Sequence, residues 1–487
     1  MALKYIMRHL PLSLVAFLFL ASTATAAPPK QPNIVLILAD DLGAFDLACD
    51  GRTDHRTPNL DKLAAAGARF TAAYAAASIC SPTRAALMTG LSPARLHLTT
   101  FLPGRGDAPS QKLLHPTIAT HLPANTATLP GLLKEAGYAT GCFGKWHLGG
   151  KGHLPTDHGF DEFYPGQANT TPSVDEGGKG EFGLTAAAGA FAEKNKDRPF
   201  FVYLAHNAPH IPYTARPDRV KTNAAAFEPT YAAVVESLDA SVGQLLQTLD
   251  NLGVADRTIV IFTSDNGGLH VPELKHERVT HNGRLRAGKG FLYEGGLRVP
   301  LIVRWPGTVK PGMVISTPVQ TADWLPTLLE IAGRKVPAGL DGVSFGGQLT
   351  GGEVPVPRSL YWHQPHYTNQ GGRPGSAIRD GNWKLIEWAE DDSAELFDLT
   401  TDPGETTDLA AKYPDRVKTL RAKLATWRTG LGAQTMSPNP AFDTTKHRAL
   451  YIDPDPSKFA PATASPVTFE AMRAWRKRTD AAVAAQR

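Results

Sequence analysis

Oxygen-bearing side chains follow two apolar segments that lie far apart in the chain. Asp40 and Asp41 directly follow one segment, and Asp265 and Asn266 follow the other. If both segments are parallel strands, their carboxyl ends meet at one edge of a sheet, and the four side chains converge there. Three carboxylates and an amide oxygen suit a hard cation, with Ca²⁺ the first expectation and Mg²⁺ the second. Either pair alone is more typical of a polar turn, so the metal hypothesis depends on both pairs.

Two lysines and two histidines lie in short loops and could act on an anionic substrate. Lys145 and His147 are two residues apart in the loop G-K-W-H-L-G. His210 follows a proline at the end of another apolar segment, and Lys289 lies between two glycines. A lysine can bind an anionic oxygen and a histidine can transfer a proton, although each of these residues alone is also typical of a solvated surface loop.

Cys80 begins the pattern C-x-P-x-R-x4-T-G, which ends at Thr89 and Gly90. The pattern places the cysteine in a tight turn at the start of a predicted helix. A lone cysteine in an alanine-rich segment is also typical of a small apolar core residue. Taken together, this pattern, G-K-W-H and D-N-G-G resemble the sulfatase family, and the matching segments extend from Asn33 to about Pro300.

The family resemblance implies that Cys80 is oxidised after translation to formylglycine (3-oxoalanine). One hydroxyl of the hydrated aldehyde would attack sulfur, and the other would later expel the sulfate. A formylglycine-generating enzyme that uses oxygen, or a radical maturase, would act on this cysteine as a partner. The implied metal ligands are Asp40, Asp41, Cys80, Asp265 and Asn266.

The same resemblance implies roles for the cationic and imidazole side chains. Arg84 would hold the formylglycine oxygens. Lys145 and Lys289 would clamp the sulfate oxygens and offset charge as the S–O bond breaks. His210 would donate a proton to the leaving alcohol, and His147 would remove the proton from the remaining hydroxyl.

The residues that would recognise the rest of the substrate are less clearly marked. His363, His366 and Arg373 could bind a sugar or an anionic group at the mouth of the pocket, or could be structural. Exported bacterial sulfatases of similar sequence commonly act on sulfated polysaccharides, which implies a carbohydrate sulfatase with incidental activity on aryl sulfates. The alternatives are a phosphonate monoester or phosphodiester hydrolase of the same superfamily, and a non-catalytic protein that binds sulfated glycans.

Apolar runs that alternate with amphipathic segments predict an α/β fold. Helices are expected between Thr57 and Gly67 and over 231–252. The resemblance implies an alkaline phosphatase-like large domain with a mostly parallel central sheet flanked by helices. The predicted strands of this sheet are 33–39, 68–74, 139–143, 199–205 and 258–263.

The amino-acid composition of the sequence changes near Gly351. A smaller C-terminal α+β subdomain is expected there, with an antiparallel pair at 383–388 and 394–399 and a helix over 414–431. Beyond it the chain is rich in proline and alanine and is expected to wrap the surface. The predicted divisions are a signal peptide (1–26), the catalytic domain (27–355), the subdomain (356–435) and an extension (436–487).

Bulk properties limit the location and the partners of the protein. Lys4 and Arg8, an apolar stretch at 10–20 and small residues at 24–26 predict a secretory signal. The mature protein is therefore expected to be periplasmic or secreted, with no stable membrane span. A net charge of +4 over 487 residues, without a block of like charges, disfavours nucleic acid as a partner. If Cys80 is modified, Cys49 and Cys142 could pair or remain free.

Overall fold

A computed structural model describes residues 31–276, 278–352 and 357–484. The predicted secretory signal lies outside these residues, and so does the predicted domain boundary at 355. Among the described residues, no helix is both long enough and apolar enough to cross a membrane. Cys49 and Cys142 are both free, and Cys142 is buried.

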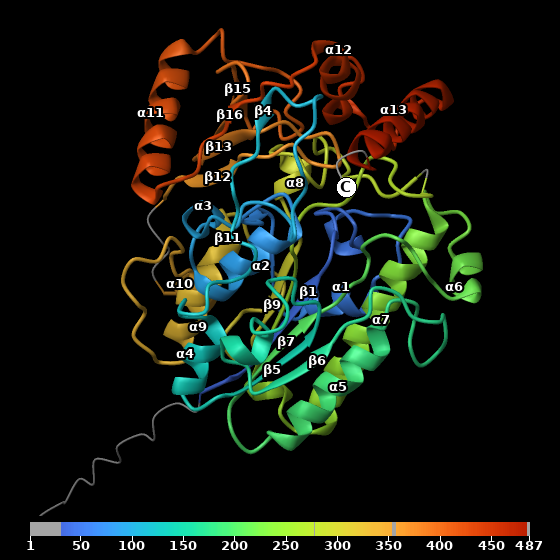
Figure 1. Cartoon of the computed structure of the whole chain (residues 1–487). Coiled ribbons are helices and arrows are strands. Elements are labelled where there is room, and N and C mark those ends of the chain that lie inside the picture. Colours follow the sequence, from blue (N-terminus) through green and yellow to red (C-terminus); the bar gives the residue numbers. More distant parts are fainter. Residues whose placement is uncertain (1–30, 277, 353–356, 485–487) are drawn as a thin grey trace, which may run out of the picture. The chain divides into compact units, whose positions relative to one another are not determined.

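An eight-stranded sheet forms the centre of the large domain, in the order β10-β2-β9-β8-β1-β7-β5-β6. Figure 1 labels its strands β1, β5, β6, β7 and β9. Its central strands pair in parallel, and only β9 runs antiparallel to its neighbours β8 and β2. The mostly parallel sheet that the sequence predicts is therefore confirmed. The strands are β1 (Asn33–Ala39), β2 (Ala68–Phe70), β5 (Ala139–Gly144), β6 (Glu162–Pro165), β7 (Phe200–Ala205), β8 (Thr258–Ser264), β9 (Leu301–Arg304) and β10 (Met313–Ile315).

Helices cover both faces of the sheet, so β1 is buried along its whole length. Val35 and Ile37 pack into one apolar cluster with α1 (Pro58–Ala65), α5 (Glu181–Lys194) and α7 (Pro229–Asn251). The alternate residues of the strand pack into a second cluster with helices on the other face. This double burial explains why the strand is continuously apolar. The helices of the second face are α2 (Cys80–Thr89), α4 (Leu129–Glu135) and α9 (Trp324–Ile331).

The predicted strand at 68–74 is two short strands in the structure. The chain leaves the main sheet after β2, and β3 (Ala73–Tyr74) pairs instead with β11 (Val319–Gln320). Further short elements of the large domain include α3 (Pro93–Leu96), β4 (Leu113–Leu114), α6 (Pro217–Thr222), α8 (Glu294–Leu297) and α10 (Gly346–Thr350).

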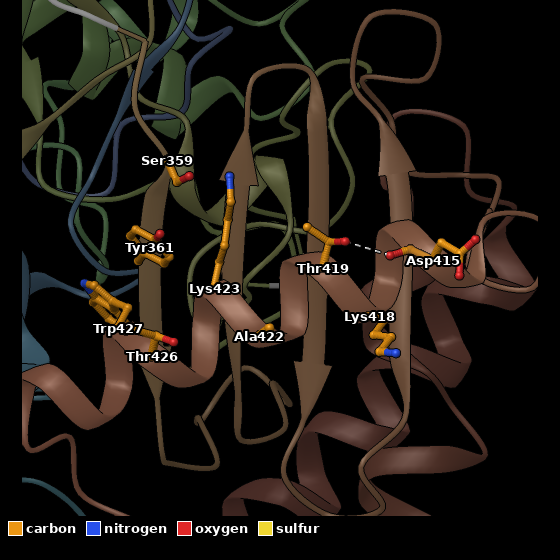
Figure 2. A pocket seen from close by; sticks show the side chains of 9 residues that line it. All are labelled: Ser359, Tyr361, Asp415, Lys418, Thr419, Ala422, Lys423, Thr426 and Trp427. Carbon is orange, nitrogen blue, oxygen red and sulfur yellow. Dashed lines mark hydrogen bonds between the residues drawn. The ribbon is translucent and has the colours of Figure 1, made fainter.

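The smaller subdomain is a four-stranded antiparallel sheet with one helix across it. The helix α11 (Pro414–Leu431) buries Leu420 and Leu424 against the sheet. Figure 2 shows α11 lying over the strands, with Trp427 stacked on Tyr361 at a ring-centroid distance of 4.9 Å. The strands are β12 (Leu360–Gln364), β13 (Gly375–Asp380), β14 (Trp383–Trp388) and β15 (Ala394–Asp398).

The last fifty residues hold more regular structure than their composition suggests. Besides β16 (Ser437–Pro438) and α12 (Thr444–His447), they form α13 (Pro466–Ala484). Phe469, Met472 and Trp475 are spaced three residues apart on α13 and join the apolar cluster of the large domain. The proline and alanine content of this segment predicts an irregular surface chain, whereas the spacing of these apolar residues is the signal for the helix.

A buried charge cluster joins the subdomain to the large domain. Lys384 of β14 is fully buried, and its Nζ lies 3.1 Å from Glu294 Oε1 and 2.8 Å from Glu405 Oε1. Glu294 also accepts a hydrogen bond from Tyr74 of β3. Buried charges are tolerated only when they are paired in this way.

Lys384→Met should lower the free energy of unfolding by about 3–5 kcal/mol, because it leaves the buried Glu405 without its cation and takes from Glu294 one of its two, the other being Arg298. Lys423→Met is the matched control, since it removes a lysine from an exposed pair with Asp380. The control should change stability by about 1 kcal/mol or less. Urea unfolding of the three proteins measures the difference, and equal losses in both variants would contradict the buried cluster's role.

Candidate active site

The structure brings the four predicted oxygen donors together at the carboxyl edge of the sheet. Asp40 and Asp41 follow β1, and Asp265 and Asn266 follow its neighbour β8, in register from Asn33 to Ala39. Asn266 Nδ2 donates to Asp41 Oδ1 at 2.8 Å, and the Asp41 N–H donates to Asp265 Oδ1 at 3.2 Å. All four side chains are buried.

Cys80 begins α2, as the sequence predicts, and its thiol interacts electrostatically with Asp265 of the acidic cluster. Its Sγ lies 3.3 Å from His147 Nδ1. Arg84 follows one helical turn later and therefore lies on the same helix face. Its guanidinium donates two hydrogen bonds to Asp265 Oδ2, at 2.7 and 3.0 Å, and a third to the Lys145 carbonyl at 2.7 Å. The arginine thus joins the cysteine helix to two loops of the site.

The loop after β5 places Lys145 and His147 in the cluster. It begins at Gly144, where φ is +112° and a Cβ would lie only 1.9 Å from the Ala205 carbonyl oxygen, so only glycine fits. Lys145 Nζ donates to Asp40 Oδ2 at 2.6 Å. His147 Nε2 is 2.9 Å from the Leu102 carbonyl oxygen, so Nε2 carries a proton and Nδ1 faces Cys80 as an acceptor.

His210 and Lys289 close the cluster from the other side. Lys289 Nζ donates to Asp41 Oδ2 at 2.8 Å and lies 2.9 Å from His210 Nε2. His210 Nδ1 is 2.5 Å from the Ile211 carbonyl oxygen, which accepts its proton. The Nε2 atom of His210 is therefore the one that faces the site.

The charges of the cluster compensate one another. Burial alone would raise the pKa of Asp40, but Lys145, His210 and two further cations hold it well below its usual range. Burial would likewise raise the pKa of the Cys80 thiol, which Lys145 and His147 instead hold well below its usual value. The pKa of Lys289 is raised, against the effect of burial, chiefly by Asp41. Asp40, Asp41 and the two lysines are therefore held charged at neutral pH, whereas burial and the neighbouring Asp40 raise the pKa of Asp265 to about 8.

The acidic cluster fits a divalent cation. Asp40 Oδ1 and Asn266 Oδ1 are buried and have no hydrogen-bond partner among the described residues. Ligand atoms of Asp40, Asp41 and His210 lie within 4.8 Å of one another. Buried oxygens that lack partners need a donor or a cation. The oxygen-rich set suits Ca²⁺ or Mg²⁺ better than a softer metal.

The three residues predicted to contact the rest of the substrate each have protein partners. His363 contacts Ser376 Oγ and the Gln434 carbonyl oxygen, both at 2.8 Å. His366 is buried, and its Nε2 lies 2.8 Å from Thr99 Oγ1. Arg373 pairs with Glu390 at 3.2 Å. None of these contacts joins the catalytic cluster, so substrate binding by these residues stays a prediction.

One buried cation near the site was missed in the sequence analysis. Lys179 is only 1% exposed and lies in the turn G-G-K-G-E. Burial lowers its pKa to about 8, while Asp40 opposes the shift. The flanking glycines were the available signal, since they resemble those around Lys289, but the turn belongs to none of the recognised motifs.

Comparisons with known proteins agree with the fold and the site. Residues 32–334 match the family model described as sulfatase, and residues 287–429 match the C-terminal model of N-sulphoglucosamine sulphohydrolase. Human arylsulfatase A is 35% identical over 83% of this chain and 89% of its own length. The N-acetylgalactosamine-6-sulfatase of Mus musculus is 33% identical over 78% of this chain and 77% of its own.

Solved structures show the same likeness. The crystal structure of Ps i-CgsB in complex with k-i-k-neocarrahexaose superposes with a TM-score of 0.72 and 31% identity, over 82% of this chain and 93% of that one. The α/β fold, with its acidic edge and its cysteine helix, defines a hydrolase of sulfuric esters. The chain belongs to the sulfatase family.

Ca²⁺ or Mg²⁺ should raise the melting temperature of EDTA-treated protein, since a ligand that binds only the folded state stabilises it by about 2.7 kcal/mol at a hundred times its Kd. Asn266→Ala should reduce this shift, because it removes a buried oxygen that lacks a partner. Asp323→Asn, a buried carboxylate paired with Arg358 outside the cluster, should leave the shift unchanged. An equal shift in all three proteins, measured by thermal unfolding, would argue against the assigned site.

Proposed function

We propose that the protein hydrolyses sulfate esters of carbohydrates with a formylglycine derived from Cys80 and a divalent metal. The observation that supports this most strongly is the surroundings of Cys80. A buried cysteine faces the acceptor nitrogen of a histidine at 3.3 Å, beside two lysines that lower its pKa. An apolar filler would not need these neighbours, whereas a reactive group at this position does.

Two groups supply chemistry that the unmodified side chains lack. The hydrated aldehyde of formylglycine supplies one hydroxyl that attacks sulfur and a second that later releases the sulfate. Asp40, Asp41, Asp265 and Asn266, together with residue 80, would hold the divalent cation, which would supply Lewis acidity that lowers a hydroxyl pKa.

The lysines bind the anionic part of the substrate. Lys145 Nζ lies 2.6 Å from Asp40 Oδ2, and Lys289 Nζ lies 2.8 Å from Asp41 Oδ2. Coulombic effects of both ammonium groups act on the thiol of residue 80. They are suited to bind sulfate oxygens and to offset charge as the S–O bond breaks. Arg84, bound to Asp265, orients the helix that carries residue 80.

The histidines move protons at two different atoms. His147 Nδ1 faces residue 80 and, because Nε2–H is bonded to the Leu102 carbonyl, is free to accept a proton from a hydroxyl there. His210 Nε2 faces the site beside Lys289, and in the imidazolium form, with a proton on each ring nitrogen, His210 would donate the Nε2 proton to the oxygen of the leaving alcohol. Each transfer contributes about 10²–10⁴-fold to the rate.

The carbohydrate preference and the export of the protein are also part of the proposal. One relative is an N-acetylgalactosamine-6-sulfatase, and one structural neighbour was solved with a neocarrahexaose, so related proteins at 31–33% identity handle sugars. The predicted secretory signal would place the enzyme where such polysaccharides occur. The maturation enzyme that oxidises Cys80 would be its partner before or during export.

Cys80→Ala should abolish sulfate release and leave the fold intact, because the nucleophile is lost while a buried alanine is tolerated at the start of a helix. Mass spectrometry of the peptide that contains Cys80 should show an aldehyde in place of the thiol in active enzyme. An unmodified thiol in fully active protein would disprove the formylglycine hypothesis. Circular dichroism of the variant provides the control for folding.

A panel of defined sulfated saccharides should release sulfate, and the catalytic efficiency on an aryl sulfate should exceed that on the matched aryl phosphonate ester. Ion chromatography measures the sulfate. Activity on aryl sulfates alone would count against the carbohydrate preference. A higher efficiency on the phosphonate would favour the alternative hydrolase, and saccharide binding without sulfate release would favour a non-catalytic binding protein.

A further inference from the structure

A glycine-rich turn (residues 177–181) packs against the segment between β7 and α6 (residues 206–216), which carries His210. A Cβ at Gly178 would lie 2.0 Å from the Thr214 carbonyl oxygen, so the two backbones are in direct contact. The carboxylate of Glu181, which ends the turn, accepts hydrogen bonds from the N–H groups of Gly178, at 3.0 Å, and Lys179, at 2.9 Å. The turn is therefore stabilised by the side chain of Glu181.

Lys179 extends from this turn and bonds to the same segment. Its Nζ donates to the Pro212 carbonyl oxygen and to Asn169 Oδ1, both at 2.8 Å. The hydroxyl of Thr214 donates to the same Asn169 oxygen at 3.1 Å. A lysine that is 1% exposed must have such acceptors, because an unsatisfied buried ammonium is costly. Lys179 thus connects the turn to Pro212 directly and to Thr214 through Asn169.

The direction of the His210 imidazole depends on that segment. Its Nδ1 bonds to the carbonyl of Ile211 at 2.5 Å, and the next carbonyl along the chain, that of Pro212, is the one that Lys179 holds. The two carbonyls belong to adjacent peptide planes that meet at the Cα of Pro212. The proline ring fixes φ there, so ψ alone separates the planes, and holding the second carbonyl limits how far the first can turn. The Nε2 atom then stays 2.9 Å from Lys289 Nζ, facing the site.

We propose that Lys179 is a positioning residue that aims His210 Nε2 at the leaving group, so that it matters most for sulfate esters whose alcohols leave poorly. The proposal rests on the proposed role of His210 as proton donor. A sugar hydroxyl needs a proton as the S–O bond breaks, whereas a nitrophenolate leaves as a stable anion without one. Misplacing a proton donor therefore slows the first kind of substrate and spares the second.

Lys179→Met should lower kcat/KM for a sulfated saccharide about tenfold more than for 4-nitrophenyl sulfate, since the loss is a fraction of a proton-transfer effect of about 10²–10⁴-fold. For aryl sulfates of phenols with progressively higher pKa, the loss in kcat/KM should rise from the value for 4-nitrophenyl sulfate toward the value for the saccharide. The matched control is Lys194→Met, a change at an exposed lysine on α5, which should leave the whole series unchanged. Equal losses on every substrate would overturn the proposal, because a merely structural role predicts them.

A double variant tests whether Lys179 acts through His210. In a His210→Ala background, Lys179→Met should change the saccharide rate by about twofold or less, because residues that act as one unit are not additive. In the otherwise unchanged enzyme, Lys179→Arg should lose less of the saccharide rate than Lys179→Met, since a guanidinium can donate to both acceptors. Additive losses would show that the lysine acts independently of the histidine and would overturn the proposal.

A structural measurement separates this inference from the proposed function. If His210→Ala slows all sulfate esters equally, the acid role of His210 is wrong, and the positioning claim is decided by a crystal structure of Lys179→Met. In that structure the Pro212 carbonyl and the His210 imidazole should move relative to Lys289, and an unmoved imidazole overturns the claim.

Gly178→Ala displaces the same segment with the lysine intact, since its Cβ would meet the Thr214 carbonyl. It should reproduce the same leaving-group dependence as Lys179→Met. Gly183→Ala is the matched control, because its Cβ would meet only the flexible end of Glu176 at 3.3 Å. A Gly178→Ala enzyme with unchanged rates on every ester would contradict the proposed contact.

Discussion

The site depends on the mutual compensation of buried charges at one edge of a parallel sheet. Asp40, Asp41 and Asp265 are almost fully buried, a state that carboxylates reach only when cations accompany them. Arg84 and the two lysines supply that charge from a helix and two loops. The same cations lower the pKa of the cysteine thiol, so one electrostatic arrangement both stabilises the edge and prepares residue 80 for chemistry.

The sheet topology explains why these residues meet. The strands β5, β7, β1 and β8 are adjacent and parallel, so the loops after them open on the same side. Each loop contributes to the cluster: Lys145 and His147 after β5, His210 after β7, and the oxygen donors after β1 and β8. The helix α2, which begins with Cys80, completes the site, because its Arg84 bonds to two of these loops. The fold thus brings motifs that are short and far apart in the sequence together at the carboxyl edge of the sheet.

Much of this arrangement could be predicted from the sequence, because its signals are local. The apolar run before Asp40 predicts β1 with the observed limits, and the helix that begins at Cys80 follows from the proline two residues later. Other elements depend on distant partners. The run at 68–74 divides between two sheets because its second half pairs with Val319–Gln320, and α13 becomes regular where Trp475 is covered by the large domain. Neither partner can be recognised from the segment itself.

The sequence by itself determined the residue types of the site, their order and their family, since motifs of a few residues carry that information. Only the tertiary structure decided which nitrogen of each histidine faces the cluster, because that depends on carbonyls at Leu102 and Ile211. It also decided that Lys179 belongs to the surroundings of His210, and that His363, His366 and Arg373 have partners of their own. These contacts join positions far apart in the chain, and chain folding alone sets their distances.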